Sequence, residues 1–498
     1  MKKILFLSAT VLMLASCDLD INENPNYPSS SDITPELMFP AVENSIADCI
    51  GDQMFNYAGF FAQYFEQAPT ANQYNTLAEL NINEGSDLFN RCYSALYAGA
   101  LQDIKDIMSK TDNPANLFAL TVMRAQAFQV LVDNLDKVPY TEALQGSENA
   151  MPAWDEGKDV YAGVLAEMDE AEAALGSEAI TMTDPLLNKS VSQWRGYANA
   201  LRLRMYMRLI DGGVNAADYQ NKAKALVAAN NFFAGDVAWN VYTNASGQYS
   251  PWYGAYYRLG TINHCATYPI VSYMQATEDP RLGAYIGTAA RTGEYYGQIP
   301  GCKTLMGPWS GGEAADWKNE DVSCINYPTV ADAPIYLFTQ AELQFLIAEV
   351  QLRFNNNAAA AKAAYEAAVA ADFASRGVDG ASAFLAGNRV KFDAQSSSAA
   401  QLKLIYMQKW TAFFMRNHME GWSEARRTDV PAVSSRTAKQ VFDDATTYTA
   451  GDFIVPGVNN IVAGGLAKRV PYPSNARTLN RNTPEAKLLS DRVFWDAK

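Results

Sequence analysis

The sequence predicts a mostly α-helical protein in which tetratricopeptide-like helix pairs form a scaffold and a large loop-rich insertion carries short strands. The scaffold is predicted because apolar residues recur at helical spacing over long stretches, in pairs that follow one another at intervals of some tens of residues. The insertion is predicted because residues 232–334 lose this period and are rich in Gly, Pro, Tyr, Trp and Asn. With 49% hydrophobic and only 19% charged residues, the 498-residue chain has the composition of a folded protein.

The first 16 residues are predicted to be a signal peptide. Lys2 and Lys3 give a positive start, and residues 4–14 form an apolar run of the length expected for secretion. The run ends in LASC (14–17), which looks like a bacterial lipobox, where the cysteine sulfur takes a diacylglycerol as a thioether and cleavage makes it the N-terminus. Two or three acyl chains, at about 0.8 kcal/mol per buried methylene, anchor a protein stably. We therefore expect Cys17 to be lipidated; the alternative is an ordinary signal peptide that happens to contain a cysteine.

Residues 17–35 are expected to be the lipidated N-terminus and a tether, because they are rich in Asn, Pro and Ser. Residues 36–498 are expected to form a single domain, with the helical scaffold in 36–231 and 335–430. The clearest apolar stripes run through 117–131, 160–175, 194–209 and 337–352. ELQFLIAEVQLRF (342–354) and AKAAYEAAVA (361–370) resemble the first and second helices of one tetratricopeptide-type repeat.

The segment 232–334 is too long to be a plain loop inside a compact protein. We expect it to be an elaborated insertion with short strands or short helices, and such irregular regions often carry function. Residues 431–498 form a second loop-rich segment.

The charge of the chain and its motifs exclude several classes of function. A formal net charge of −15, without any run rich in Lys or Arg, argues against nucleic-acid binding. No P-loop, GxSxG, HExxH or dinucleotide-binding glycine pattern is present. His264 and His418 lie far apart in the sequence, so a two-histidine metal site is not expected. DLDIN (18–22) lacks the glycine and the terminal glutamate of a calcium loop, so no cofactor is expected, with calcium left open only in 232–334.

A surface glycoside hydrolase is the main enzymatic alternative. Such an enzyme needs two carboxyl groups that face each other about 5 to 9.5 Å apart. The adjacent acids Asp155 and Glu156, or Glu278 and Asp279, point in different directions on any regular element. An acidic chain contains such neighbours by composition alone, so the sequence favours a protein that is not an enzyme.

Five cysteines remain after Cys17, namely Cys49, Cys92, Cys265, Cys302 and Cys324. Because five is odd, at least one thiol stays free in a monomer. None lies in a CxxC arrangement, so a zinc site is not expected. The sequence leaves the pairing open, with Cys302 and Cys324 as one candidate pair across a loop in an oxidising compartment.

Six segments in order, behind the lipobox, resemble the SusD/RagB family of outer-membrane nutrient-binding lipoproteins and span most of the chain. They are DKVPYTEALQG (136–146), WDEGKDVYAGVLAEMDEAEAAL (154–175), WRGYANALRLRMYMRL (194–209), IYLFTQAELQFLIAEVQLR (335–353), IYMQKWTAFFMRNHMEGWSEARRTDVP (405–431) and RVPYPSNARTLN (469–480).

The resemblance implies a cell-surface lipoprotein anchored in the outer membrane, above a TonB-dependent transporter of the SusC type that it closes like a lid. It also implies binding of oligosaccharides, or of peptides in some branches, without chemistry on them. The acids that follow Cys17 look like the surface-export signal of such lipoproteins. The matched motifs lie on the scaffold and transfer no ligand site, so for Trp422, Arg426 and Arg427 we expect helix-end packing and ion pairs. A purely adhesive surface protein remains a third alternative.

Sugar binding without catalysis needs flat aromatic faces for a pyranose ring, edged by amide and charged groups for its hydroxyls. Such mixtures occur in QAPTANQYN (67–75), in QYSPWYGAYYRLGTINH (248–264) and around the later aromatic residues of the insertion. The candidate ligand-binding residues are Asn72, Tyr74, Trp252, Tyr253, Tyr256, Tyr257, Arg258, Asn263, Tyr296, Trp309 and Trp317. A subset of them is expected to form an exposed platform; the alternative is that most are buried supports of an irregular region.

Overall fold

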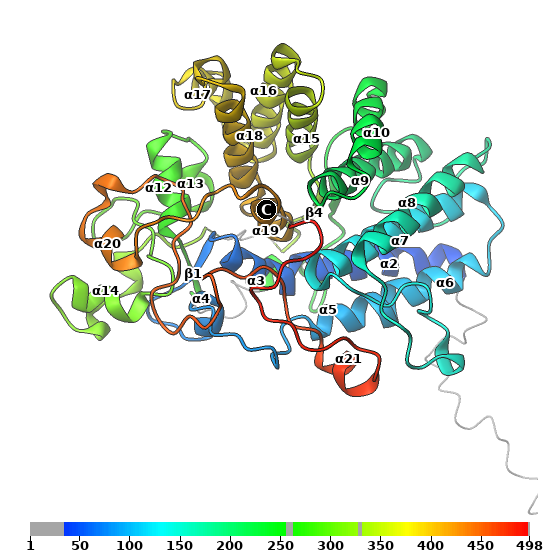
Figure 1. Ribbon diagram of the computed structural model, residues 1–498, viewed down its shortest axis with the longest axis horizontal. Coiled ribbons are helices and arrows are strands. Elements are labelled where there is room, and N and C mark those ends of the chain that lie inside the picture. The colour runs from blue at the N-terminus through cyan, green and yellow to red at the C-terminus, as the bar shows by residue number, and fades with distance from the viewer. Residues whose placement is uncertain (1–33, 255–261, 327–330, 497–498) are drawn as a thin grey trace, which may run out of the picture.

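The computed structural model describes residues 34–254, 262–326 and 331–496, and the chain is mostly helical, as the sequence predicts. Helix pairs build the scaffold (Figure 1). They are α7 (Pro114–Leu135) with α8 (Gly157–Ala173), α9 (Val191–Asp211) with α10 (Ala216–Ala229), α15 (Gln340–Arg353) with α16 (Ala358–Ser375), and α18 (Ser398–Phe413) with α19 (His418–Thr428). The predicted helix-pair architecture is confirmed.

Polar caps set where several of these helices begin. The side chain of Asn113 accepts the backbone N–H of Ala115 at 2.8 Å, directly before Pro114, the first residue of α7. Thr339 in the same way caps α15, and Asn417 caps α19. Each cap satisfies backbone donors that the first turn leaves unpaired, and Pro114 lacks the donor altogether.

The N-terminal helices pack across these pairs. They are α2 (Pro35–Gly51), α3 (Gln53–Phe61), α5 (Asn90–Ser94), the π-helix Ala95–Leu101 and α6 (Gln102–Met108). Helix α2 contacts α6, α7 and the π-helix, while α3 packs against α19 near the other end of the sequence. By length and composition α7 could cross a membrane, yet 89% of its apolar window is buried inside the fold. It is the kind of apolar helix that a large helical core requires.

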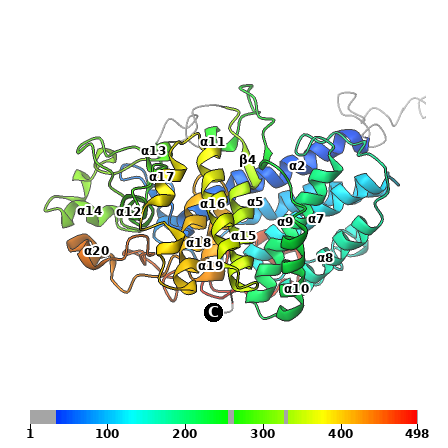
Figure 2. The ribbon, with the colours of Figure 1, turned by 90° about the horizontal axis from the view of Figure 1, so that it is seen from above.

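The loop-rich part lies at the opposite end of the molecule from α8 and α10 (Figures 1 and 2). It carries the short strands predicted for it. Strand β2 (Val237–Trp239) pairs antiparallel with β4 (Ile335–Phe338), with Val237 opposite Phe338, so the two ends of the insertion meet beside the scaffold. Strand β1 (Phe65–Gln67) pairs antiparallel with β3 (His264–Ala266). Short helices occur in this part and elsewhere along the chain. They are α4 (Asn75–Ala78), α11 (Pro251–Tyr253), α12 (Tyr268–Ala276), α13 (Leu282–Tyr285), α14 (Lys303–Trp309), α17 (Ala381–Ala386), α20 (Ala438–Asp443) and α21 (Ser474–Leu479).

Two hydrophobic cores support this arrangement. The larger one runs through the helix pairs and the N-terminal helices. The smaller one, here called the satellite core, joins α14 to α20 and consists of Ile299, Cys302, Met306, Ala438, Val441 and Ile454. Residues of the insertion therefore pack against the C-terminal segment, and the two loop-rich regions recognised in the sequence form one structural unit.

The five cysteines of the described residues are not linked to one another in the structure, and Cys302 and Cys324 are not placed to pair. The two residues belong to different packing environments. Cys302 lies in the satellite core against Gly457, where a Cβ atom would come within 2.6 Å of its sulfur. Cys324 instead lies opposite Cys265 in an antiparallel β-bridge.

Candidate functional site

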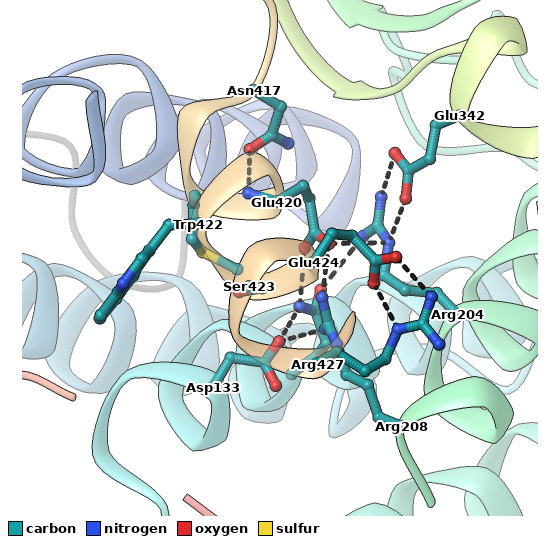
Figure 3. Close-up of polar contacts among 12 residues, drawn as sticks. Asp133, Arg204, Arg208, Glu342, Asn417, Glu420, Trp422, Ser423, Glu424 and Arg427 are labelled. Carbon is teal, nitrogen blue, oxygen red and sulfur yellow. Dashed lines mark hydrogen bonds and ion pairs between the residues drawn. The ribbon is translucent and has the colours of Figure 1, made fainter. Parts of the chain in front are cut away.

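A cluster of buried charges joins helices of the scaffold (Figure 3). Arg427 contacts Glu349 at 2.7 Å and Glu424 at 2.6 Å. Arg204 makes a two-pronged contact with Glu342, at 2.7 and 2.8 Å. Burial by itself would raise the pKa of Glu349, but Arg427 and Arg353 outweigh it and hold that pKa at about 2. Because these charges are enclosed and neutralise one another, the cluster is suited to joining helices.

Trp422 and Arg426 also have the structural roles expected for them. Both are buried, and the guanidinium of Arg426 lies 3.6 Å from the centre of the Trp422 ring. The indole N–H of Trp422 donates to the carbonyl oxygen of Ala467 at 3.1 Å, and Arg426 donates to that of Lys468 at 2.9 Å. These contacts tie α19 to the C-terminal segment.

The acid pairs considered for hydrolysis are engaged in structural contacts. Asp155 accepts the backbone N–H of Tyr140 at 2.8 Å, and Glu156 pairs with Lys137 at 2.5 Å. Asp279 is buried against Arg281 at 2.5 Å. Asp155, Glu156 and Asp279 are thus each bound to a structural partner.

Both histidines are packed imidazoles that contact the Phe65 ring, with ring centres 4.7 Å from it for His264 and 4.8 Å for His418. Burial lowers the pKa of each to about 3, so both are neutral at physiological pH. Within residues 34–254, 262–326 and 331–496, no group of three or more His, Cys, Asp and Glu side chains is placed to hold a metal ion.

Amide side chains meet where the loop after β1 reaches β3; Gln73 is exposed, whereas Gln67 and Asn263 are buried. The ring of Tyr74 stacks on His264, with ring centres 4.9 Å apart and planes at 19°. The amide of Asn263 donates to Gln73 at 3.0 Å, and the amide of Gln67 donates to the carbonyl oxygen of Asn263 at 2.8 Å. The antiparallel register, which sets Gln67 opposite His264, brings these two distant segments together.

Lys303, the first residue of α14, binds the same loop through hydrogen bonds from its ammonium group. Its ammonium donates to the side chain of Asn72 at 2.7 Å and to the carbonyl oxygen of Ala71. Burial lowers the pKa of Lys303, although the nearby Glu66 acts in the opposite direction. Burial also raises the pKa of Glu66 to about 8, so this carboxyl is mostly protonated at pH 7 and accepts the backbone N–H of Gly301 at 3.0 Å. The loop is thus fixed by a nearly buried lysine.

Four half-buried aromatic rings are connected to this loop, and we call them the aromatic row: Trp317, Tyr296, Tyr268 and Tyr448. Successive ring centres are 6.0, 6.5 and 5.4 Å apart. All four rings pack against the satellite core and remain partly exposed. The row is connected to the amide-rich loop through Gln298, which accepts the indole N–H of Trp317 at 3.0 Å and donates to the carbonyl oxygen of Gln67 at 2.6 Å. Together, the loop 70–75 and the aromatic row form the candidate site.

The structure brings together only part of the predicted platform. Asn72, Tyr74, Tyr296 and Trp317 lie in the candidate site, and Asn263 is buried directly behind it. Tyr256, Tyr257 and Arg258 lie outside the described residues, as does Cys17.

Three predicted aromatic residues lie elsewhere. Trp252 is only 2% exposed and stacks on Phe55 at 4.9 Å in the main core, so it offers no ring face to a ligand. Trp309 lies against Phe442 of α20 at 5.2 Å. Tyr253 packs against Tyr249 at 5.6 Å. The physical reason for the difference is that a loop-rich segment also needs aromatic side chains packed beneath it, and composition does not distinguish these from rings that face solvent.

Sequence reasoning missed Gln298, Lys303, Tyr268 and Tyr448. Tyr268 begins a helix and Tyr448 comes from the C-terminal segment, 180 positions later in the sequence, so no local pattern links them. Asn319 was missed too, although it lies two residues after Trp317; its side chain accepts the backbone N–H of Thr70 at 3.1 Å.

A separate groove of about 500 Å³ lies on the helical scaffold between α6, α7 and α8. It is lined by Met108, Pro114, Leu117, Thr121, Arg124, Glu167, Glu170, Ala171 and Ala174. No aromatic ring lines it, so it lacks the stacking surface that a pyranose ring requires. The candidate site on the loop-rich part is therefore the better match to a sugar.

The buried charges of the scaffold serve to join its helices, and the half-buried aromatic row beside the loop 70–75 is the candidate binding surface. A family model described as "Starch-binding associating with outer membrane" matches residues 25–448, so the chain belongs to this SusD-like family. Its association with the outer membrane is a property of the family, and its members are binding proteins rather than enzymes. The predicted family is confirmed.

Solved structures share the fold over nearly the whole chain. A chitin-binding SusD homologue from Flavobacterium johnsoniae has a TM-score of 0.72 and 22% identity, covering 91% of this chain and 98% of its own. A SusD homologue from Bacteroides uniformis has a TM-score of 0.69 and 20% identity, covering 92% and 99%. A SusD homologue from Bacteroides fragilis has a TM-score of 0.72 and 20% identity, covering 94% and 100%. No functionally curated protein matches the sequence significantly.

Proposed function

We propose that this protein is a cell-surface lipoprotein that binds oligosaccharides and delivers them to a SusC-like TonB-dependent transporter in the outer membrane. The observation that carries the proposal is the aromatic row beside the amide-bearing loop 70–75. Ring faces pack against the apolar face of a sugar, while Asn72 and its neighbours offer donors and acceptors to the hydroxyl groups. The starch-binding description of the family and the chitin-binding homologue support a glycan as the ligand class.

The lipid anchor is the second part of the proposal. Cys17 at the end of the lipobox would hold the chain at the membrane, and the residues between it and α2 would act as its tether. Mass spectrometry of the N-terminal peptide tests the anchor, because a Cys17→Ser variant can carry no thioether-linked lipid. An unmodified Cys17 in exported protein would refute this part alone.

The binding site is tested with Trp317→Ala and a matched control, Trp309→Ala. Both remove a half-buried indole from the edge of the satellite core, but Trp309 packs on α20 outside the aromatic row. Trp317→Ala is expected to weaken binding of starch or chitin oligosaccharides about tenfold or more in calorimetry, through the loss of roughly 1.5–3 kcal/mol of ring contact. Trp309→Ala is expected to keep the affinity within about twofold. Equal losses in both variants would place the ligand elsewhere.

The same samples separate this proposal from its alternatives. Product analysis after prolonged incubation tests for hydrolysis, and a peptide mixture run beside the glycans tests for peptide binding. We expect binding without turnover, and we expect the affinity to be unchanged by a calcium chelator. Co-purification with the transporter from detergent-solubilised outer membranes tests the delivery step, which fails if the lipoprotein elutes alone.

A further inference from the structure

Two buried cysteines lie opposite each other on α2 and α5. Cys49 lies near the end of α2 and Cys92 lies in α5. The sulfur of Cys49 is 3.7 Å from the carbonyl oxygen of Cys92, and the sulfur of Cys92 is 3.8 Å from that of Cys49. This reciprocal arrangement places both thiols between the same two backbone segments. The two residues are 43 positions apart in the sequence.

We propose that Cys49 and Cys92 form a disulfide bond in the exported protein. The proposal rests on the extracytoplasmic location given under the proposed function, because thiols are kept reduced in the cytosol and are oxidised outside it. An exported thiol–disulfide oxidase would supply the oxidising power. The two thiols lose two protons and two electrons, a bond forms between their sulfurs, and the disulfide of the oxidase is reduced to a dithiol.

The cross-link would act on the candidate site. The loop closed by Cys49 and Cys92 contains strand β1 and the segment that carries Asn72 and Tyr74. In the structure this segment is connected to α2 only through the chain and through non-covalent packing. A covalent bond at its far end would restrict its freedom in the unfolded chain, and it would oppose local opening of the segment in the folded one.

The other thiols are not placed in this way. The thiol of Cys265 donates to the carbonyl oxygens of Glu66 and Gln67, at 3.6 and 3.7 Å, whereas Cys324 donates to that of Asn319 at 3.8 Å. These two thiols are therefore directed to different partners, although their backbones form a β-bridge.

Both cysteines line a small cavity, but their side chains are buried in the folded protein. A cavity of about 120 Å³ reaches both cysteines and is also lined by polar residues, among them Gln53 and Arg91. Burial and the neighbouring Cys49 raise the pKa of Cys92 well above its ordinary value, which keeps its thiolate scarce in the folded protein. Oxidation is therefore expected during folding, while the thiols are still accessible.

The test uses the full chain, exported by a Gram-negative host, quenched with N-ethylmaleimide before lysis and then denatured in its presence so that buried thiols also react. Non-reducing digestion and mass spectrometry should find the Cys49 and Cys92 peptides joined, and Cys302 alkylated. Reductant should lower the melting temperature by roughly 4 °C, as expected for a closed loop of about 44 residues in a chain of this size. The Cys49→Ser variant should show no such shift, whereas Cys302→Ser should keep it.

A second arm refolds the purified chain in a glutathione redox buffer and so removes the dependence on compartment. Cys49 and Cys92 left unlinked after refolding would overturn the proposal on geometry. A link that forms in this buffer but is absent from exported protein would overturn it on location. Glycan affinity is measured on the same samples. If Trp317→Ala binds glycan like the unchanged protein, the proposed binding site is refuted, and this outcome does not depend on the result for the thiols.

Discussion

Replacing Arg427 by methionine tests the structural role assigned to the buried charges of α19. Arg427 is fully enclosed, and it contacts Glu349 and Glu424 at 2.7 and 2.6 Å. The substitution keeps much of the apolar stem and removes the charge, leaving Glu349 buried with Arg353 as its ion-pair partner, at 2.7 Å. A pKa of about 2 for Glu349, against an ordinary 4.5, corresponds to about 3 kcal/mol of net favourable interaction.

We therefore expect Arg427→Met to lower the free energy of unfolding by about 3–5 kcal/mol, the usual cost of removing one partner of a buried pair. Urea denaturation followed by tryptophan fluorescence measures it. The double variant Arg427→Met, Glu349→Leu should recover at least half of the loss, because no unpaired carboxylate then remains at that position. Since the folded pKa of Glu349 is depressed, its contribution is present above pH 4.5 and is lost as the pH falls towards 2.

The matched control is Arg291→Met, which breaks the pair with Asp321. The side chain of Arg291 is 57% exposed, so its loss should leave the urea midpoint essentially unchanged. The oligosaccharide affinity of Arg427→Met, measured where the variant is folded, should stay within about twofold. A stability loss below about 1 kcal/mol, or loss of glycan binding in a fully stable variant, would refute the assignment of Arg427 to the scaffold.

Three further predictions concern pH and packing. Burial raises the folded pKa of Glu66 to about 8, so the stability that its protonated form contributes is lost as the pH rises from 4.5 to 8. Compared with Glu66→Gln, the unchanged protein should lose about 1.4 kcal/mol of unfolding free energy per pH unit over that range. Urea titrations at several pH values measure this loss. His418 has the opposite pH dependence, because burial lowers its pKa to about 3. Relative to His418→Phe, the unchanged protein should lose about 2 kcal/mol of unfolding free energy as the pH falls from 6.5 to 5. Parallel stability–pH curves for the two proteins would contradict the burial of His418 as a neutral ring. Gly196→Ala would place a Cβ atom 2.2 Å from the backbone nitrogen of Phe233 and should lower the free energy of unfolding by at least about 1–3 kcal/mol, measured by thermal unfolding. The control Gly99→Ala, whose Cβ would be 3.5 Å from the nearest side chain, should cost less. Equal costs would show that the contact of α9 with Phe233 is not rigid.

Much of the scaffold could be predicted because its signals are local. A helix buries residues three or four apart, so the stripes at 117–131 and 337–352 reveal α7 and α15 without knowledge of their partners. The caps at Asn113 and Thr339 are equally local, since a side chain next to the first turn satisfies that turn's donors. The loss of helical period in 232–334 likewise marked the insertion.

The candidate site was only partly predictable, because ring exposure depends on long-range packing. Trp252 and Trp317 stand in similar loop-rich surroundings, yet the first stacks on Phe55 in the main core and the second stays at the edge of the satellite core. Lys303 gave no sequence signal, although it holds Asn72 from 231 positions away. Composition can propose aromatic platforms, but it cannot say which rings reach the surface.

The sequence by itself determined the helix pairs, the non-catalytic character of its motifs and the family to which the chain belongs. Each of these depends on residues close together in the chain or on motifs in a fixed order. Only the tertiary structure decided that Tyr268 and Tyr448 extend the row begun by Trp317 and Tyr296, and that Cys49 faces Cys92. The physical reason is that strand pairing between β1 and β3 and packing around the satellite core bring together segments hundreds of residues apart, and no local period encodes such contacts.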